Sequence, residues 1–144
     1  MKSLQSMATG LALALLATAA SANDTLVSVP NSTALAWQQV PGTDGAVSYA
    51  NVEGDLFGKG AYSAFVKFRK GTDNGLHSHS QALPTVVLGG TFYAVIDGKR
   101  VEYPAGAYYH LPANLVHESG CSAAADCLLF QYQPGAFDLV PAQG

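Results

Sequence analysis

Four histidines, gathered in two short segments of the chain, are the residues best suited to bind a metal ion. His77 and His79 are separated by one residue, and His110 and His117 follow in a second segment. On a β-strand, residues two apart point to the same face, so His77 and His79 would present their imidazoles together. The same pattern also occurs in surface or polar-core histidines, so its meaning depends on the elements that carry it.

The sequence around these histidines predicts a series of short β-strands. Residues 61–70 alternate between the two faces of a strand, with Ala64, Val66 and Phe68 on one face. After Gly45, the apolar residues do not recur with the sustained spacing of a helix. Many short strands separated by turns are typical of a β-sandwich or a β-barrel. The further strands are expected at residues 85–88, 91–96, 101–103, 107–111 and 127–132.

Glycine-containing turns are predicted between these strands. Asp97 and Gly98 lie between two apolar runs and predict a type I′ hairpin, whose two central residues both need a positive φ. Residues 71–75 and 104–106 are predicted to be turns as well.

Composition supports a single globular domain. The chain has 144 residues, of which 49% are hydrophobic and 12% charged, and its formal net charge is −3. The apolar content excludes a disordered protein, and the low charge content argues against a coiled coil. The small negative charge gives no attraction to nucleic acid or to an anionic membrane surface.

Residues 1–22 are predicted to be a cleaved secretory signal peptide. Lys2 supplies a positive charge, an apolar run spans residues 11–16, and Ala20–Ala22 match the small-x-small cleavage pattern. The alternative is an uncleaved membrane anchor, but the run is short and no basic cluster follows it. We therefore expect an exported protein, periplasmic or secreted, without stable membrane insertion after cleavage. Residues 23–45 would be an approach segment and residues 46–144 the β-domain.

Two cysteines, Cys121 and Cys127, flank a short loop in the exported part of the chain. In an oxidising compartment this spacing predicts a disulfide, and the alternative is a pair of reduced, buried thiols. Asn31 begins an N-glycosylation sequon, which matters only in a eukaryotic secretory pathway.

The spacing of these glycines, histidines and a proline resembles the two motifs of the cupin superfamily. The first motif is matched by Gly71, His77, His79 and Gly90, and the second by Gly106, Pro112 and His117. The resemblance covers residues 37–140 and is closest to small, uncharacterised single-domain cupins, whose flanking segments resemble Gly54–Gly58 and Gly135–Asp138. It implies an all-β fold, a cupin-type antiparallel β-barrel of the double-stranded β-helix or jelly-roll kind.

The resemblance also implies a metal site. His77, His79 and His117 occupy the three histidine positions, whereas the usual glutamate position falls at Leu83 or Pro84, and neither can bind a metal. A three-histidine site would keep coordination positions open for water, O₂ or a bidentate substrate. One divalent transition metal is expected, Fe(II), Zn(II), Cu(II), Ni(II) or Mn(II), and the spacing does not choose among them. The alternative is a degenerate cupin whose histidines are polar filling.

Other residues near the motifs are weaker candidates. His110 is a candidate fourth ligand or acid–base group, and Tyr108, on the same strand face, is a candidate ligand-binding or catalytic residue. Gln81 could add a carbonyl oxygen to the metal site. Asn114 stands where the second motif usually has glycine, and asparagine tolerates a left-handed backbone.

Two functions are compatible with this sequence. The first is an exported metalloenzyme that acts on a small organic molecule, with dioxygenase-like or isomerase/lyase-like activity. The second is a non-catalytic module that binds a small molecule or a metal ion. The missing glutamate favours binding and the intact histidine trio favours catalysis; on balance we expect an enzyme. By resemblance, a homodimer formed through outer sheets is also expected.

Overall fold

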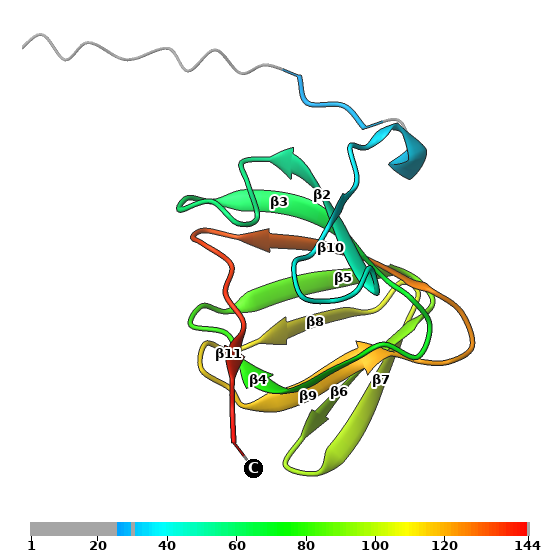
Figure 1. Cartoon of the computed structure of the whole chain (residues 1–144), viewed down its shortest axis with the longest axis vertical. Coiled ribbons are helices and arrows are strands. Elements are labelled where there is room, and N and C mark those ends of the chain that lie inside the picture. The colour runs from blue at the N-terminus through cyan, green and yellow to red at the C-terminus, as the bar shows by residue number, and fades with distance from the viewer. Residues whose placement is uncertain (1–25, 30, 144) are drawn as a thin grey trace, which may run out of the picture.

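The computed structural model of the protein describes residues 26–29 and 31–143. In this part of the chain two antiparallel sheets face each other, and one short 3₁₀-helix, η1 (Ser32–Ala34), precedes them (Figure 1). The predicted signal peptide, residues 1–22, lies outside the described residues. Among the described residues, no helix has the length and apolar character needed to cross a bilayer.

The larger sheet contains six strands in the order β1-β2-β3-β10-β5-β8. In chain order these strands are β1 (Gln38–Gln39), β2 (Val47–Glu53), β3 (Tyr62–Phe68), β5 (Leu83–Gly89), β8 (Tyr108–Leu111) and β10 (Cys127–Gln133). The first of these, β1, lies in the segment that precedes residue 46 and extends the sheet by pairing with β2.

The smaller sheet contains five strands in the order β11-β4-β9-β6-β7 and carries both histidine segments. Its strands are β4 (Asp73–Ser78), β6 (Thr91–Ile96), β7 (Lys99–Pro104), β9 (His117–Cys121) and β11 (Val140–Pro141). The two sheets are separate hydrogen-bonded ladders, so the predicted all-β jelly roll is confirmed as a two-sheet sandwich and not as one continuously paired barrel.

Strand β3 shows how the alternating sequence produces the core. Ala64, Val66 and Phe68 are buried between the sheets, while Lys67 on the other face packs its ammonium group over the ring of Trp37. This confirms the predicted alternation. The predicted hairpin turn is confirmed too, because Asp97 and Gly98 have φ values of 51° and 72°.

The turn predicted at residues 71–75 is only partly correct. Strand β4 begins at Asp73, inside that segment, and continues to Ser78. The residue types of this Gly, Asp and Asn cluster suggested a turn, and Gly75 does adopt a positive φ, 67°. Here that conformation belongs to an irregularity within a strand and not to a chain reversal.

Cys121 and Cys127 connect the two sheets at one end of the sandwich. Cys121 ends β9 in the smaller sheet and Cys127 begins β10 in the larger sheet. Their sulfur atoms lie 2.07 Å apart, as the predicted pairing requires. Both side chains are buried, so this link forms part of the core that fixes the position of β9, the strand that carries His117.

Candidate metal centre

Three histidines meet on the inner face of the smaller sheet. His77 on β4 and His117 on β9 are paired directly across the two strands, and His79 lies one residue beyond the end of β4. Their ring centroids are separated by 4.3 Å (His77–His117), 5.0 Å (His77–His79) and 5.5 Å (His79–His117). One nitrogen from each ring lies within 4.8 Å of the others, a spacing that could hold a metal ion. All three side chains are at most 5% exposed.

Hydrogen bonds to main-chain carbonyl groups orient each imidazole. Nδ1 of His77, His79 and His117 lies 2.9 Å, 2.6 Å and 3.0 Å from the carbonyl oxygens of Gly75, Asp138 and Leu115, respectively. A carbonyl oxygen only accepts, so Nδ1 carries the proton and donates it in each case. The neutral ring then keeps a lone pair on Nε2, which is the form in which histidine binds metals.

The Nε2 atom of His117 shows that the arrangement fits a metal ion. This atom is buried and has no hydrogen-bond partner among the described residues. Leaving a buried acceptor unpaired costs about 1–3 kcal/mol, so such atoms usually have a partner. A divalent cation coordinated by Nε2 would be that partner. The donor set of neutral imidazoles suits a transition metal and not Mg²⁺ or Ca²⁺.

The surroundings keep the rings of His77 and His79 uncharged. Burial lowers the pKa of His77 from 6.5 to about 4, against the opposing effect of the Gly75 carbonyl, and the neighbouring imidazoles lower it further. Burial also lowers the pKa of His79, although the hydrogen bond to Asp138 opposes it. At neutral pH both side chains therefore retain the lone pairs that a metal needs.

The turn before β9 connects the two histidine segments. Asn114 adopts φ 61°, which confirms that asparagine takes a left-handed backbone at this position. Its main-chain N–H donates to the carbonyl oxygen of His79 at 2.7 Å. One residue later, the Leu115 carbonyl accepts from His117. This single turn therefore helps to position two of the three candidate ligands.

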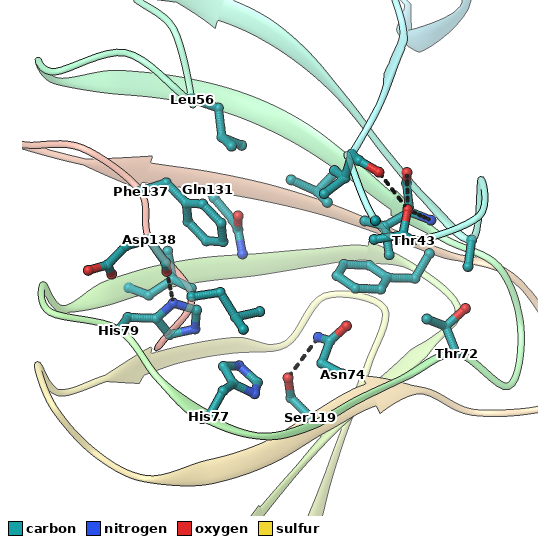
Figure 2. Close-up of a pocket in the computed structure, with 18 of the residues that line it drawn as sticks. Thr43, Leu56, Thr72, Asn74, His77, His79, Ser119, Gln131, Phe137 and Asp138 are labelled. Carbon is teal, nitrogen blue, oxygen red and sulfur yellow. Dashed lines mark hydrogen bonds between the residues drawn. The ribbon is translucent and has the colours of Figure 1, made fainter. Parts of the chain in front are cut away.

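The C-terminal segment holds His79 from the other side. The Asp138 carbonyl accepts from His79 (Figure 2). The Asp138 carboxylate accepts from both the main-chain N–H and the hydroxyl of Ser80. Strand β11 then pairs with β4 alongside His77. Phe137 places its ring 5.4 Å from that of His79 and lines the cavity in front of the histidines.

A cavity of about 670 Å³ lies between the sheets and opens beside the three imidazoles. Its walls are mainly apolar, with aromatic rings from both sheets. Several uncharged polar side chains also reach it, among them Asn74 and Ser119, which are hydrogen-bonded to each other, and Gln131 from the opposite sheet (Figure 2). An apolar pocket with a few convergent polar groups is the usual form of a small-molecule site.

Comparison with known protein families identifies the chain. Residues 64–136 match the family model described as "Cupin domain". The chain belongs to the cupin family. The match contains both histidine segments and the strands that position them, and it leaves out the C-terminal residues Phe137 and Asp138, which complete the site in this cupin.

Solved structures of low sequence identity share the fold. The polyketide cyclase RemF from Streptomyces resistomycificus is 13% identical, with 83% of this chain and 87% of that chain covered and a TM-score of 0.68. KdgF from Halomonas sp. is 17% identical, with 72% and 92% covered and a TM-score of 0.57. An RmlC-like cupin from Ralstonia eutropha is 16% identical, with 76% and 69% covered and a TM-score of 0.61. No curated protein matches this cupin.

The weaker candidates from the sequence lie apart from the histidine trio. His110 is on β8 and exposed, and the histidine group that could hold a metal ion, searched among the described residues, does not include it. Tyr108, on the same strand, is 60% exposed. Gln81 packs its amide against Gly135 and does not line the cavity. At the glutamate position, Leu83 lines the cavity with an apolar side chain.

Three residues of the site did not emerge from the sequence. Ser119 could have been found, because it lies two residues after His117 on the same strand face. Asn74 is an odd number of residues from His77, so strict alternation assigns it to the opposite face. Asp138 acts on His79 through its main-chain carbonyl, a group present at every position and therefore invisible in the sequence.

Proposed function

We propose that this cupin is an exported metalloenzyme that acts on a small organic molecule held in the cavity between the sheets. His77, His79 and His117 would hold one divalent transition metal. The observation that carries the proposal is the buried Nε2 of His117, which has no hydrogen-bond partner in the described part of the chain, in a trio whose Nδ1 atoms all donate to carbonyl groups. This trio lines a cavity large enough for a small molecule.

A bound divalent ion would supply Lewis acidity toward substrate oxygens and, for a redox-active metal, a means of using O₂. The chain's own residues define what could bind beside it. Because all three candidate ligands are imidazoles and the usual glutamate position falls at Leu83 or Pro84, no carboxylate among the candidate ligands would offset the charge of the ion. An anionic oxygen donor, such as a carboxylate, an enolate or a phenolate, is therefore the favoured substrate group.

The cavity walls add a second requirement. Phe68, Phe92 and Phe137 line the cavity, so the body of the substrate should be apolar and preferably cyclic. These walls would also exclude water from the reacting centre. The fold that this chain shares with a polyketide cyclase supports a search among carbonyl-bearing and phenolic molecules.

Turnover assays on metal-loaded protein test this proposal. The protein, loaded separately with Fe(II), Mn(II), Zn(II), Cu(II) or Ni(II), is incubated with diketones, phenols and hydroxy acids, while O₂ uptake and product formation are followed. We expect conversion with at least one metal and none with folded His117→Ala. Equal conversion by His117→Ala would contradict a role for the histidine trio.

A non-catalytic binding module is the second candidate. The observation in its favour is that the polar side chains facing the cavity beside the histidines, Asn74 and Ser119, form an amide–hydroxyl pair that cannot act as an acid or base near neutral pH. Saturable binding of a molecule that is recovered unchanged with every metal would favour this function over the enzyme.

Export is part of the proposal. Support comes from the signal-peptide pattern ending at Ala22 and from the Cys121–Cys127 pair, which suits an oxidising compartment. Expression of the whole chain in a bacterium, followed by fractionation and mass spectrometry, should recover a mature form that begins at Asn23 outside the cytoplasm. Recovery of the intact chain in the cytoplasm alone would contradict export.

A further inference from the structure

An irregularity in β4 turns a second polar side chain toward the cavity. Between Asp73 and Leu76, β4 contains one residue more than the facing segment of β9. A regular strand would point residues 74 and 77 to opposite faces, but a bulge allows both to face the same side. As a result, Asn74 and His77 both line the cavity (Figure 2).

The bulge is held by its own set of interactions. The Asp73 carboxylate accepts a hydrogen bond from the main-chain N–H of Gly75 at 2.6 Å and another from the hydroxyl of Tyr93 at 2.5 Å. Gly75 takes the positive φ that the bulge requires, and its carbonyl orients His77. The same local structure therefore positions a candidate metal ligand and Asn74.

Asn74 meets Ser119 on the neighbouring strand. The amide Nδ2 of Asn74 donates to the Ser119 hydroxyl oxygen at 3.0 Å. Ser119 is 4% exposed and lies two residues beyond His117 on β9, so both point inward. Two residues of an extended strand span about 7 Å, which separates this amide–hydroxyl pair from the histidine trio.

The amide–hydroxyl pair retains free hydrogen-bonding capacity toward the cavity. Its internal hydrogen bond uses one Asn74 N–H and one lone pair of Ser119. Among the residues that the structure describes, the Ser119 hydroxyl hydrogen, the Asn74 carbonyl oxygen and the second Asn74 N–H have no side-chain hydrogen-bond partner. Two donors and one acceptor in an apolar surrounding match the requirements of a hydroxyl or carbonyl oxygen, because a buried polar group needs a partner.

We propose that Asn74 and Ser119 form a second recognition point, which binds a hydroxyl or carbonyl oxygen of the molecule whose other end reaches the histidine trio. The ligand class is a mainly apolar, cyclic molecule with oxygen groups at two positions about 7 Å apart. This inference rests on the proposed function only in assuming that one oxygen of the ligand binds at the histidine trio. The amide–hydroxyl pair itself needs no metal.

Binding of two matched probes to the whole mature protein tests the inference. The probes are 1,5-dihydroxynaphthalene, with a hydroxyl on each ring, and 1-naphthol, with one hydroxyl. Affinities are measured by calorimetry on Zn(II)-treated protein, and the metal content of each sample is determined in parallel. In the wild type we expect the second hydroxyl to raise the affinity roughly tenfold.

Two variants remove the amide–hydroxyl pair from different strands. In Asn74→Leu and in Ser119→Ala we expect the advantage of the dihydroxy probe to shrink to less than about threefold, with the affinity for 1-naphthol little changed. Ser119→Ala is the milder change, and it keeps the test available if Asn74→Leu does not fold. Gln81→Leu makes the same amide-to-leucine change at a residue that does not line the cavity, and it should leave the advantage intact.

The inference is overturned if the wild type binds neither probe, or if it binds both probes with equal affinity. It is also overturned if both probes weaken equally in Asn74→Leu and Ser119→Ala, because that is the effect of a merely structural role. The metal content of each sample shows whether the proposed metal site has failed independently of the recognition point. If the wild type takes up no metal but still prefers the dihydroxy probe, the metalloenzyme proposal is contradicted and the second recognition point is supported. If it takes up metal but shows no preference between the probes, the recognition point is contradicted and the metal site is supported.

Discussion

His77 and His117 are direct partners in the β4–β9 ladder, and their ring centroids lie 4.3 Å apart. The distance between these rings is therefore set by strand register. A slip of one residue would turn one of the two imidazoles to the outer face of the sheet. The bulge at Gly75, the turn at Asn114 and the C-terminal strand β11 all adjoin this ladder, and each contributes to keeping the register.

Gly120 should be essential to this register. A Cβ atom at position 120 would lie 2.3 Å from the Thr72 carbonyl oxygen and 2.6 Å from the Tyr93 hydroxyl. We expect Gly120→Ala to lower the free energy of unfolding by roughly 2–4 kcal/mol, or to prevent folding, because β4 must move away from β9. Urea unfolding followed by circular dichroism measures the effect.

The control for this substitution is Gly60→Ala, where an added Cβ meets nothing within 4 Å. Its unfolding midpoint should stay close to that of the wild type. If Gly120→Ala were as stable as Gly60→Ala, the close packing of β4 on β9 described here would be wrong.

Asp138 should affect metal binding although it is not a candidate ligand. Its carboxylate is tied to Ser80, and its carbonyl orients His79. We expect Asp138→Ala to loosen this contact and to weaken metal affinity by roughly 10-fold or more. A competition titration against a chromogenic chelator measures the affinity.

Asp126→Ala is the matched control for Asp138→Ala. The Asp126 carboxylate also accepts from a main-chain N–H, that of Lys70, but it lies in the loop between the cysteines and does not line the cavity. The metal affinity of this variant should equal that of the wild type. Equal affinities for all three proteins would show that the C-terminal segment does not orient His79.

The metal-free protein should lose stability in mild acid. Burial lowers the pKa of His77 to about 4 in the folded state, against the ordinary histidine value of 6.5. Between these values the unfolded chain binds a proton that the folded chain does not. The neutral, buried His77 therefore makes its full contribution to the free energy of unfolding above about pH 6.5. This contribution is lost as the pH falls toward 4. The loss should be on the order of 1–3 kcal/mol.

Urea midpoints of the metal-free protein at pH 7 and pH 4.5 measure this loss. Carboxylates also titrate in this range, so the informative comparison is with His77→Gln, whose midpoint should depend less steeply on pH. An identical pH dependence in His77→Gln and the wild type would contradict a buried, neutral His77.

The elements that the sequence predicted are those in which local pattern and tertiary packing agree. In β3, alternation alone identifies Ala64, Val66 and Phe68 as buried, and at Asp97 and Gly98 the residue types required by the turn are explicit. The resemblance to the cupin motifs implied the trio of His77, His79 and His117, and the structure brings these three residues together.

The features that escaped prediction depend on irregular or main-chain geometry. Asn74 reaches the cavity only because β4 contains a bulge, and the same glycine that permits the bulge suggested a turn. His110 had the residue type of a ligand, but it lies on β8 with its side chain exposed, on the strand paired with β5. Neither placement can be read from residue types alone, because both depend on which strands become neighbours.

Metal content is the most direct test of the account. The mature protein, purified without chelators and reconstituted with divalent transition metals, is analysed by inductively coupled plasma mass spectrometry beside folded His117→Ala. We predict about one metal ion per chain in the wild type and little in the variant. A wild type that stays metal-free after reconstitution, or a His117→Ala protein that binds as much metal as the wild type, would contradict it.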